Sequence, residues 1–414
     1  MAGLRFIHSA DLHLDSPFKS KSHLPDRLKE QIRASTFEAF ERLVDEAVHF
    51  QVDFVILAGD LFNEETRSLK AQVKLREGFE RLHLHNIQVY VSYGNHDFIE
   101  GAHYPITYPA NVHVFMEEEV TSFPYWRDGD HVANIYGFSY KKRAVHDKKV
   151  REFKKTGEPD FHIAMLHGSL ETQTEHDVYA PFSLNDLLEQ GMDYWGLGHI
   201  HKRQQLSVHP PVFYSGNIQG RSRKESGEKG CYVVEWRGTQ FDNTFVPLHS
   251  FTYEEVTQAA YNIEYPEAIE HLLEEAKQSV KSEQPVLLTV TLKGHEGRLM
   301  KWKSEGILSE WIDLVNEREN LEYGWIWIDQ IFIEDEPAWN EEELKASSQF
   351  AGEFLNNLDS LSSLEWEAAI APLYKHRRAG KQLEEITDEE REEIKQAAKQ
   401  LVMQQLFSGR ESGL

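Results

Sequence analysis

The 414-residue sequence contains a single cysteine, Cys231, so it cannot form a disulfide bond within one chain. It also lacks a long hydrophobic run, because no window approaches the roughly 18 consecutive apolar residues that a membrane-spanning helix needs. The N-terminal segment before the first polar motif is too short and too polar for a secretory signal peptide. From these absences we expect a cytoplasmic protein without a membrane segment, although a secreted protein without disulfides is compatible with them.

Basic side chains are scarce. The chain has 44 Lys and Arg against 69 Asp and Glu, which gives a formal net charge of −25. Such a charge repels nucleic acids and argues against binding them over a broad surface. The acidic excess is densest between residues 251 and 340, and bound divalent cations would supply positive charge where a site needs it. With 40% hydrophobic and 12% aromatic residues, the chain can form a sizeable core, so we expect two or three globular domains.

The first 250 residues alternate short apolar runs with helical patterns, which is typical of an α/β domain. The predicted strands are residues 4–8, 54–57, 87–93, 134–138, 162–166, 194–197, 212–214 and 232–236. The predicted helices are about 26–50 and 68–85. In the first helix, apolar residues such as Phe37, Phe40 and Val44 recur at helical spacing.

The remaining residues divide into two further segments. Residues 251–337 contain two amphipathic helices and two strand patterns, PVLLTVTLKG and GWIWIDQIFIEDE, which predict a small α/β or α+β domain. Residues 338–414 predict highly charged helices, one of them opened by a capping box at Thr387 and Glu390. The apolar stripes of these helices are narrow, so we do not expect them to form a core of their own.

Five short polar motifs each follow an apolar run of the first domain. They are ADLH with Asp11 and His13, GDLF with Asp60, GNHD with Asn95, His96 and Asp97, LHGS with His167, and GHIH with His199 and His201. In open α/β sheets the loops at the carboxyl ends of strands form the active-site crevice. We therefore expect these five loops to converge on one site, although their residues are far apart in the sequence.

The side chains of these motifs suit a pair of metal ions. The predicted ligands of one ion are Asp11, His13 and His201, those of the other are Asn95, His167 and His199, and Asp60 would bridge the two. Mixed imidazole and oxygen donors favour Mn²⁺, Fe or Zn over Ca²⁺ or Mg²⁺. Two ions about 3.5–4 Å apart would bind a shared hydroxide as the nucleophile and polarise a phosphoryl group.

Each motif has a simpler explanation when it is taken alone. Gly, Asn and Asp are common in turns, and a single Asp-x-His or His-x-His pair is a weak indication of a metal in a chain with 21 histidines. The complete set, in this order and always at the exit of an apolar run, is not expected by chance. We therefore favour a metal site over five unrelated turns.

The ordered motifs resemble those of the calcineurin-like metallophosphoesterase superfamily. Within it, the segments FIHSADLHLDSPF, DFVILAGDLFN, YGNHD and YWGLGHIHKRQ are similar to the SbcD-type bacterial DNA repair exonucleases, most of all to their YhaO-like branch. The motif-level similarity covers about residues 4–220. It implies an α/β fold with a metallophosphoesterase β-sandwich flanked by helices (1–250), a small capping domain for DNA recognition (251–337) and a helical C-terminal extension (338–414).

The resemblance also implies roles for individual residues. The superfamily's first metal site corresponds to Asp11, His13, Asp60 and His201, and its second to Asp60, Asn95, His167 and His199. Its catalytic histidine, which is not a ligand, corresponds to His96. Asp97 would be the partner of His96 and would favour the protonated imidazole, which could then donate a proton to the leaving oxygen.

Two departures narrow the resemblance. Similar exonucleases often have an Asp where this chain has Asn63, and because that position matches no metal ligand we expect only an indirect effect on the site. Protein serine/threonine phosphatases typically read Gly-Asp-x-x-Asp-Arg-Gly and Gly-Asn-His-Glu. The segments GDLFNEE and GNHDFI of this chain argue against that branch.

Two stretches are basic enough to contact nucleic acid. Residues 140–155, YKKRAVHDKKVREFKK, could equally be a solvated loop or helix face. The segment YSGNIQGRSRKE, which begins at Tyr214, follows a strand on the ligand side of the domain. We favour a role at the rim of the crevice for this second stretch.

The sequence thus predicts a two-metal nuclease subunit of DNA repair, with DNA as substrate and Mn²⁺ as the favoured ion. The alternatives are a phosphodiesterase for small nucleotides and a non-catalytic DNA-binding subunit that keeps the fold. The two segments beyond residue 250 favour the nuclease, since an enzyme for small molecules needs neither. The resemblance also implies a coiled-coil ATPase partner of the SbcC type, docked on the helical tail, and a homodimer formed through helices such as 26–50.

Overall fold

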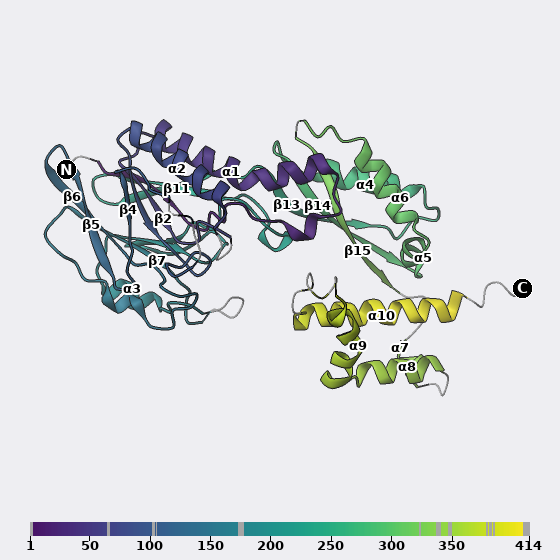
Figure 1. Ribbon diagram of the computed structural model, residues 1–414. Helices are drawn as coiled ribbons and strands as arrows, with labels where there is room; N and C mark the ends of the chain where they lie inside the picture. The colour runs from purple at the N-terminus through teal and green to yellow at the C-terminus, as the bar shows by residue number, and fades with distance from the viewer. Residues whose placement is uncertain are drawn as a thin grey trace, which may run out of the picture. The chain divides into compact units, whose positions relative to one another are not determined.

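The computed structural model describes residues 3–63, 67–101, 104, 106–172, 178–322, 324–336, 341–346, 350–377, 380, 383 and 386–408. The chain divides into two compact units (Figure 1). The first comprises Met1–Glu255, Val280–Thr289 and Glu319–Gln330, and the second comprises Val256–Ser279, Val290–Arg318 and Ile331–Leu414. None of the helices within the described ranges is long and apolar enough to cross a membrane.

Two six-stranded sheets form the first unit. The strands of the first sheet are, in spatial order, β12 (Phe241–Pro247), β11 (Gly230–Trp236), β1 (Arg5–Ser9), β2 (Phe54–Ala58), β3 (Gln88–Ser92) and β4 (Val112–Val114). Those of the second are β5 (Thr121–Arg127), β6 (Asp130–Gly137), β7 (Phe161–His167), β8 (Tyr194–Gly198), β10 (Pro211–Tyr214) and β9 (Gln204–Val208). All eight strands predicted from the sequence are present, and β4, β5, β9 and β12 are additional.

The two sheets pack face to face over a buried aromatic core. Phe6 of β1 stacks on Phe54 of β2 with ring centroids 5.0 Å apart, and it meets Tyr194 of β8 edge-on at 5.1 Å. Helices α1 (Asp26–His49) and α2 (Leu69–Leu84) bury their apolar sides against the outer face of the first sheet (Figure 1). The short helix α3 (Leu184–Glu189) packs over the second sheet through Leu187. This is the β-sandwich flanked by helices that was predicted.

Strand direction explains why polar motifs meet at one edge. Strands β1, β2, β3 and β4 run parallel to one another, as do β6, β7, β8 and β10. The carboxyl ends of neighbouring parallel strands lie at the same edge of a sheet, so the loops that follow them are neighbours too. Except for the edge strand β4, these strands are buried along most of their length, and side chains that bind ligands are therefore confined to their ends.

The segment beyond residue 250 contributes to both units. Its elements are β13 (Thr252–Ala259), α4 (Ala268–Ser279), β14 (Val286–His295), α5 (Arg298–Ser304), α6 (Ile307–Glu317) and β15 (Ile326–Glu336). The strands form a sheet in the order β13-β14-β15. Residues 280–289 and 319–330, which the sequence assigned to the capping domain, pack within the first unit. The three-domain division by residue number stays a prediction.

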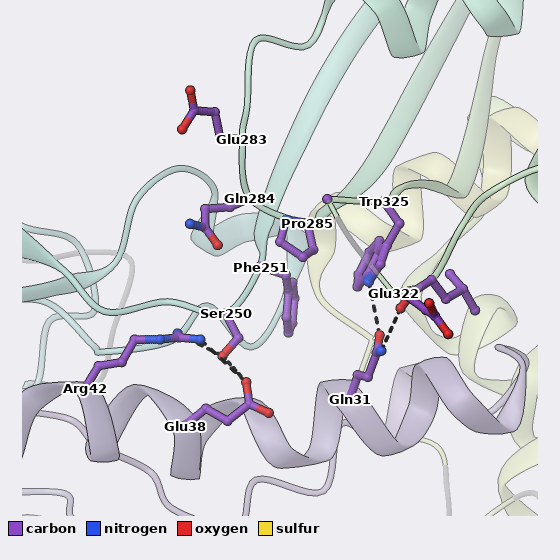
Figure 2. A pocket seen from close by; sticks show the side chains of 12 residues that line it. Gln31, Glu38, Arg42, Ser250, Phe251, Glu283, Gln284, Pro285, Glu322 and Trp325 are labelled. Carbon is purple, nitrogen blue, oxygen red and sulfur yellow. Dashed lines mark hydrogen bonds and ion pairs between the residues drawn. The ribbon is translucent and has the colours of Figure 1, made fainter.

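A buried tryptophan explains why residues 319–330 pack within the first unit. The Trp325 side chain is 3% exposed, and its indole N–H donates to Gln31 Oε1 of α1 at 3.0 Å. Figure 2 shows this contact at one side of a pocket of about 400 Å³, with Phe251 and Pro285 nearby and the Glu38–Ser250–Arg42 cluster at the other side. Because an indole buries a large apolar area, it draws residues 319–330 onto α1.

The tail contains helices α7 (Glu341–Lys345), α8 (Phe350–Asp359), α9 (Ser363–Lys375) and α10 (Asp388–Ser408). The predicted capping box is present, since Thr387 Oγ1 accepts the backbone N–H of Glu390 at 3.2 Å and Glu390 accepts the backbone N–H of Thr387 at 2.8 Å. The expectation that these helices form no core of their own needs correction. Ala351, Leu355 and Met403 are buried together, because the side chains of α8 and α10 face one another.

Candidate metal centre

All seven predicted ligands lie at the carboxyl ends of central strands. Their positions are Asp11 and His13 after β1, Asp60 after β2, Asn95 after β3, His167 at the end of β7, and His199 and His201 after β8. Asp11, His13, Asp60, Asn95 and His167 are all at least 93% buried. Five loops from two sheets thus bring these side chains into one place.

The first group of ligands gathers around His13. Its Nε2 atom lies 3.0 Å from Nε2 of His201 and 3.8 Å from Oδ2 of Asp60. Asp11, His13 and His201 each offer a ligand atom within 4.8 Å of those of the other two. Two imidazole nitrogens and carboxylate oxygens at these distances fit a divalent transition-metal ion.

The second group gathers around His167. Its Nε2 atom lies 3.0 Å from Oδ1 of Asn95 and 3.5 Å from Oδ2 of Asp60. Nδ1 of His199 lies 3.2 Å from the same Asn95 oxygen. The Oδ2 atom of Asp60 therefore faces both groups, as a bridging carboxylate oxygen would.

The backbone is strained where it presents these ligands. Asp11, His13, Asp60 and His199 have φ angles of 52°, 42°, 52° and 93°, in a region that costs non-glycine residues about 1–3 kcal/mol each. The glycines of the motifs make room for the ligands. A Cβ on Gly59 would lie 2.3 Å from His167 Nδ1, and one on Gly94 would lie 2.4 Å from Asp60 Oδ1. The Gly-Asp and Gly-Asn pairs thus reflect close packing beside the ligands.

Hydrogen bonds on the far side of two imidazole rings fix their orientation. The Nδ1–H of His167 donates to the carbonyl oxygen of Ala58 at 3.0 Å, which leaves Nε2 with a free lone pair toward Asp60. The Nδ1–H of His201 donates to Oε1 of Glu225 at 2.8 Å, which leaves Nε2 toward His13. Metal-bound histidines in proteins are almost always held in this way.

The charges of the site also suit a cation. Burial lowers the pKa of His13, His167 and His201, which keeps their rings neutral and able to bind a metal. Burial and the nearby charge of Asp60 raise the pKa of Asp11 well above its usual range. Burial alone would raise the pKa of Asp60 as well, but His167 and His96 lower it. A bound cation would favour the ionised form of both carboxylates.

His96 lies beside the ligands but is oriented differently from them. Its ring centroid is 5.2 Å from that of His13, and its Nδ1–H donates to the carbonyl oxygen of Asn63 at 2.9 Å. Its backbone N–H donates to Oδ1 of Asp60 at 3.0 Å. The expected partnership with Asp97 needs correction, because the ring is held by a backbone carbonyl.

Asp97 instead joins two of the ligand loops. Its Oδ1 accepts the backbone N–H of Gly94 at 2.7 Å, and its Oδ2 accepts that of Leu61 at 2.6 Å. The carboxyl is fully buried, and burial together with the charge of Asp60 raises its pKa to about 7. Asp97 therefore connects the loop after β2 to the loop after β3.

Three residues at the edge of the site were not assigned these contacts from the sequence. Asn63 joins His96 to Arg221, because its carbonyl oxygen accepts from His96 and its Oδ1 accepts from Arg221 Nη1 at 2.6 Å. Glu225, at the end of the short 3-10 helix η3 (Arg223–Glu225), holds His201. For Arg221 and Glu225 the sequence signal was that YSGNIQGRSRKE follows a strand on the ligand side of the domain, and Asn63 had been noted only as a departure from similar exonucleases.

The basic stretch 140–155 is partly neutralised within the first unit. Lys148 pairs with Glu171, Lys149 with Glu152, and Lys155 with Asp193. Lys141, Lys142 and Lys154 are exposed. The stretch therefore offers fewer available cations than its sequence suggested.

Comparison with known proteins agrees with this geometry. The profile of the family described as calcineurin-like phosphoesterase matches residues 4–203, which include strands of both sheets and all seven predicted ligands. The chain is 37% identical over 408 residues to the uncharacterized metallophosphoesterase YhaO of Bacillus subtilis, and the match covers 98% of each chain.

More distant relatives carry a functional name. The DNA double-strand break repair protein Mre11 of Methanocaldococcus jannaschii is 26% identical over 264 residues, which cover 58% of this chain and 64% of that protein. The protein of the same name from Sulfolobus acidocaldarius is 23% identical over 313 residues, covering 70% and 75% of the two chains.

Proposed function

Because the chain belongs to the calcineurin-like phosphoesterase family, whose members are metal-dependent phosphoester hydrolases, we propose that it hydrolyses phosphodiester bonds of DNA with two divalent ions. The observation that carries the proposal is the position of Asp60, whose Oδ2 lies 3.8 Å from His13 Nε2 and 3.5 Å from His167 Nε2. One carboxylate oxygen between two groups of neutral imidazoles suits a pair of ions better than a single one.

The residues would divide between the ions as follows: Asp11, His13, Asp60 and His201 for the first, and Asp60, Asn95, His167 and His199 for the second. When bound, the ions supply an activated water nucleophile and polarise the phosphoryl group. We favour Mn²⁺, with Fe or Zn as alternatives, because the donors mix imidazole with oxygen.

His96 is the proposed proton donor to the leaving oxygen. Its Nδ1–H is held by the carbonyl of Asn63, so Nε2 is the atom that would transfer the proton. Its backbone N–H is bound to Asp60, which ties the donor to the ligand shared by the two groups. Asp97 positions both residues indirectly, through the backbone of Leu61 and Gly94.

DNA is the proposed substrate class for two reasons. Distant relatives of this chain are named as DNA double-strand break repair proteins. The exposed cations Lys202 and Arg203 directly follow His201, and Lys224 lies on the neighbouring 3-10 helix. In a chain with a net charge of −25, cations beside the site would let a phosphate backbone approach there rather than elsewhere.

The proposed partners follow from the same resemblance. Helix α1 is the candidate surface for a homodimer, and the tail helices are the candidate surface for a coiled-coil ATPase of the SbcC type. We place this complex in the cytoplasm, where the single buried thiol of Cys231 needs no partner.

A substrate comparison tests the proposal. Purified protein loaded with Mn²⁺ is incubated with linear duplex DNA, single-stranded DNA, a cyclic dinucleotide and bis(p-nitrophenyl) phosphate. We expect cleavage of DNA and of the synthetic diester, both abolished by EDTA and restored by Mn²⁺. Cleavage of the cyclic dinucleotide but not of DNA would favour a phosphodiesterase for small nucleotides, and no cleavage at all would favour a non-catalytic subunit.

A further inference from the structure

Arg221 lies against the metal centre without being one of its ligands. Its Nη1 donates to Oδ1 of Asn63 at 2.6 Å, and its Nη2 lies 3.3 Å from Nδ1 of His201. Its charge contributes to lowering the pKa of His13 and His201, which places it within electrostatic reach of both. Arg221 is thus a cation close to the ligands of the first ion.

The guanidinium has donors left over. Its Nε–H is buried and makes no hydrogen bond to any of the described residues. The Nδ1–H of His201 is already directed at Glu225, so the neighbouring Nη2 is not needed to satisfy that ring. The side chain is 21% exposed, so a ligand can reach it.

The surroundings hold Arg221 in place, and its ion pair with Glu225 is long, at 3.9 Å. Asn63 is a neutral amide, so it accepts a hydrogen bond without forming an ion pair. Glu225 is the nearest carboxylate, at 3.9 Å from Nη2, and it already accepts from His201, from Asn217 Nδ2 and from the backbone N–H of Arg221. An Asp at position 63, as in similar exonucleases, would instead pair with the guanidinium.

Asn63 also places Arg221 beside the proposed proton donor. The carbonyl oxygen of Asn63 holds His96, and the side-chain oxygen of the same residue holds Arg221. Because Asn63 holds both side chains, a phosphoryl group that presents its leaving oxygen to His96 also lies close to the guanidinium of Arg221. The planar fork of guanidinium donors matches two oxygens of a phosphate.

We infer that Arg221 is a phosphate-binding catalytic residue whose guanidinium contacts the non-bridging oxygens of the scissile phosphodiester. The neutral side chain of Asn63 positions this guanidinium. The inference rests on the proposed function and names a further residue of the same site. Arg221 stabilises the negative charge that develops on the phosphoryl oxygens as the bond to the leaving group breaks.

The test compares Arg221→Gln with Arg237→Gln. Arg237 is a matched control because it is 62% exposed, pairs with Glu235 and Asp242, and lies just after β11, beside the start of β1 and away from the strand ends that carry the ligands. Hydrolysis of bis(p-nitrophenyl) phosphate is measured with Mn²⁺. The affinity of the Mn²⁺-loaded protein for inorganic phosphate, measured by calorimetry, is the second readout.

We expect Arg221→Gln to lower kcat/KM about 100-fold and to weaken phosphate binding about 10-fold or more, with the metal content unchanged. Added guanidinium ion should restore part of the lost activity. Arg237→Gln should match the wild type in both readouts. Wild-type phosphate affinity and activity in Arg221→Gln would overturn the inference.

Asn63→Asp provides a second variant, in case Arg221→Gln loses its metal or its fold. It keeps the backbone carbonyl that holds His96 and leaves Arg221 present, but adds a carboxylate that pairs with the guanidinium. We expect weaker phosphate binding at unchanged metal content, and an unchanged affinity would contradict the inference. If the wild type hydrolyses no phosphodiester, the proposed function fails instead, which the wild-type assay alone reveals.

Discussion

The Nε2 atoms of His13 and His201 face each other at 3.0 Å, although 188 residues separate them in the sequence. Two neutral imidazoles at this distance share either one proton or one metal ion. Burial lowers the pKa of both rings, so each offers a lone pair rather than a charge. Glu225 accepts from the opposite nitrogen of His201, which directs the Nε2 lone pair toward His13.

Replacing Glu225 tests this arrangement. Glu225→Gln should weaken binding of the Mn²⁺ ion assigned to His201 about 10–100-fold, because His201 loses the carboxylate that fixes its orientation and increases its basicity. Calorimetric titration of the metal-free protein measures the change. The control is Glu228→Gln, an exposed residue of the same loop, which should bind as the wild type does. Equal Mn²⁺ affinities for Glu225→Gln and Glu228→Gln would show that Glu225 does not support the metal centre.

His96 should matter for turnover but not for metal binding. His96→Ala should retain both ions and lose about 10²–10⁴-fold in the rate of DNA cleavage, which is the usual contribution of a general acid. The rate of cleavage of a diester with a p-nitrophenyl leaving group should fall much less, because that group departs without a proton. The comparison of the two substrates is the measurement. Loss of an ion from His96→Ala would show that His96 is a ligand.

The convergence of the predicted ligand side chains could be anticipated from the sequence because each signal is local. Asp11, Asp60 and Asn95 directly follow strands whose apolar runs are visible, and strand ends in this fold face the site. The side chains around the ligands were harder to predict. The partner of His96 was assigned to the adjacent Asp97, but it is the carbonyl of Asn63, since the tight turn directs the Asp97 carboxyl at the backbone of its own and a neighbouring loop.

The packing between residues far apart in the sequence could not be predicted either. Trp325 lies in a run that predicts a strand of the capping domain, and nothing in that run shows that it packs against Gln31 of α1. Glu225 was seen only as the end of a basic stretch. Its contact with His201 depends on the turn between β10 and β11, and turns of this kind leave no periodic pattern.

Stability should depend on pH through the buried His8. Its Nδ1 lies 3.0 Å from the hydroxyl of Tyr194 and its Nε2 lies 3.2 Å from the carbonyl oxygen of Leu197, and burial lowers its pKa to about 3. The folded-state pKa lies below the unfolded value, so the stabilisation is present above pH 6.5 and is lost as the pH falls toward 3. One extra proton bound by the unfolded chain costs about 1.4 kcal/mol per pH unit.

Urea unfolding of the metal-free protein at pH 7 and pH 5 measures this dependence. His8→Gln can keep hydrogen bonds to both neighbours but cannot be protonated, so its free energy of unfolding should fall less than that of the wild type. The remaining slope would come from other buried histidines such as His167. An identical fall in both proteins would show that His8 does not contribute.

The tail should serve a partner rather than the metal centre. Leu364 and Leu373 of α9 are 78% and 57% exposed, so this helix presents apolar side chains that a partner could cover. Deleting residues 338–414 should leave metal binding and cleavage of short DNA nearly intact. It should abolish association with the coiled-coil ATPase and ATP-dependent action on long duplex DNA.

A point variant separates docking from folding in that experiment. Leu364→Glu should reduce co-purification with the ATPase, whereas Leu84→Glu should not, because Leu84 is equally exposed, at 80%, but lies on α2. A truncated protein that still co-purifies at wild-type stoichiometry would show that the tail has only a structural role.

The bridging position of Asp60 is tested most directly by calorimetric titration of metal-free protein with Mn²⁺, comparing the wild type with Asp60→Ala and His13→Ala. The wild type should bind two ions per chain. His13→Ala should lose one of them, and Asp60→Ala should lose tight binding of both, because its Oδ2 lies between the two ligand groups. A wild type that binds one ion or none, or an Asp60→Ala variant that still binds two tightly, would contradict a two-metal phosphodiesterase built around this carboxylate.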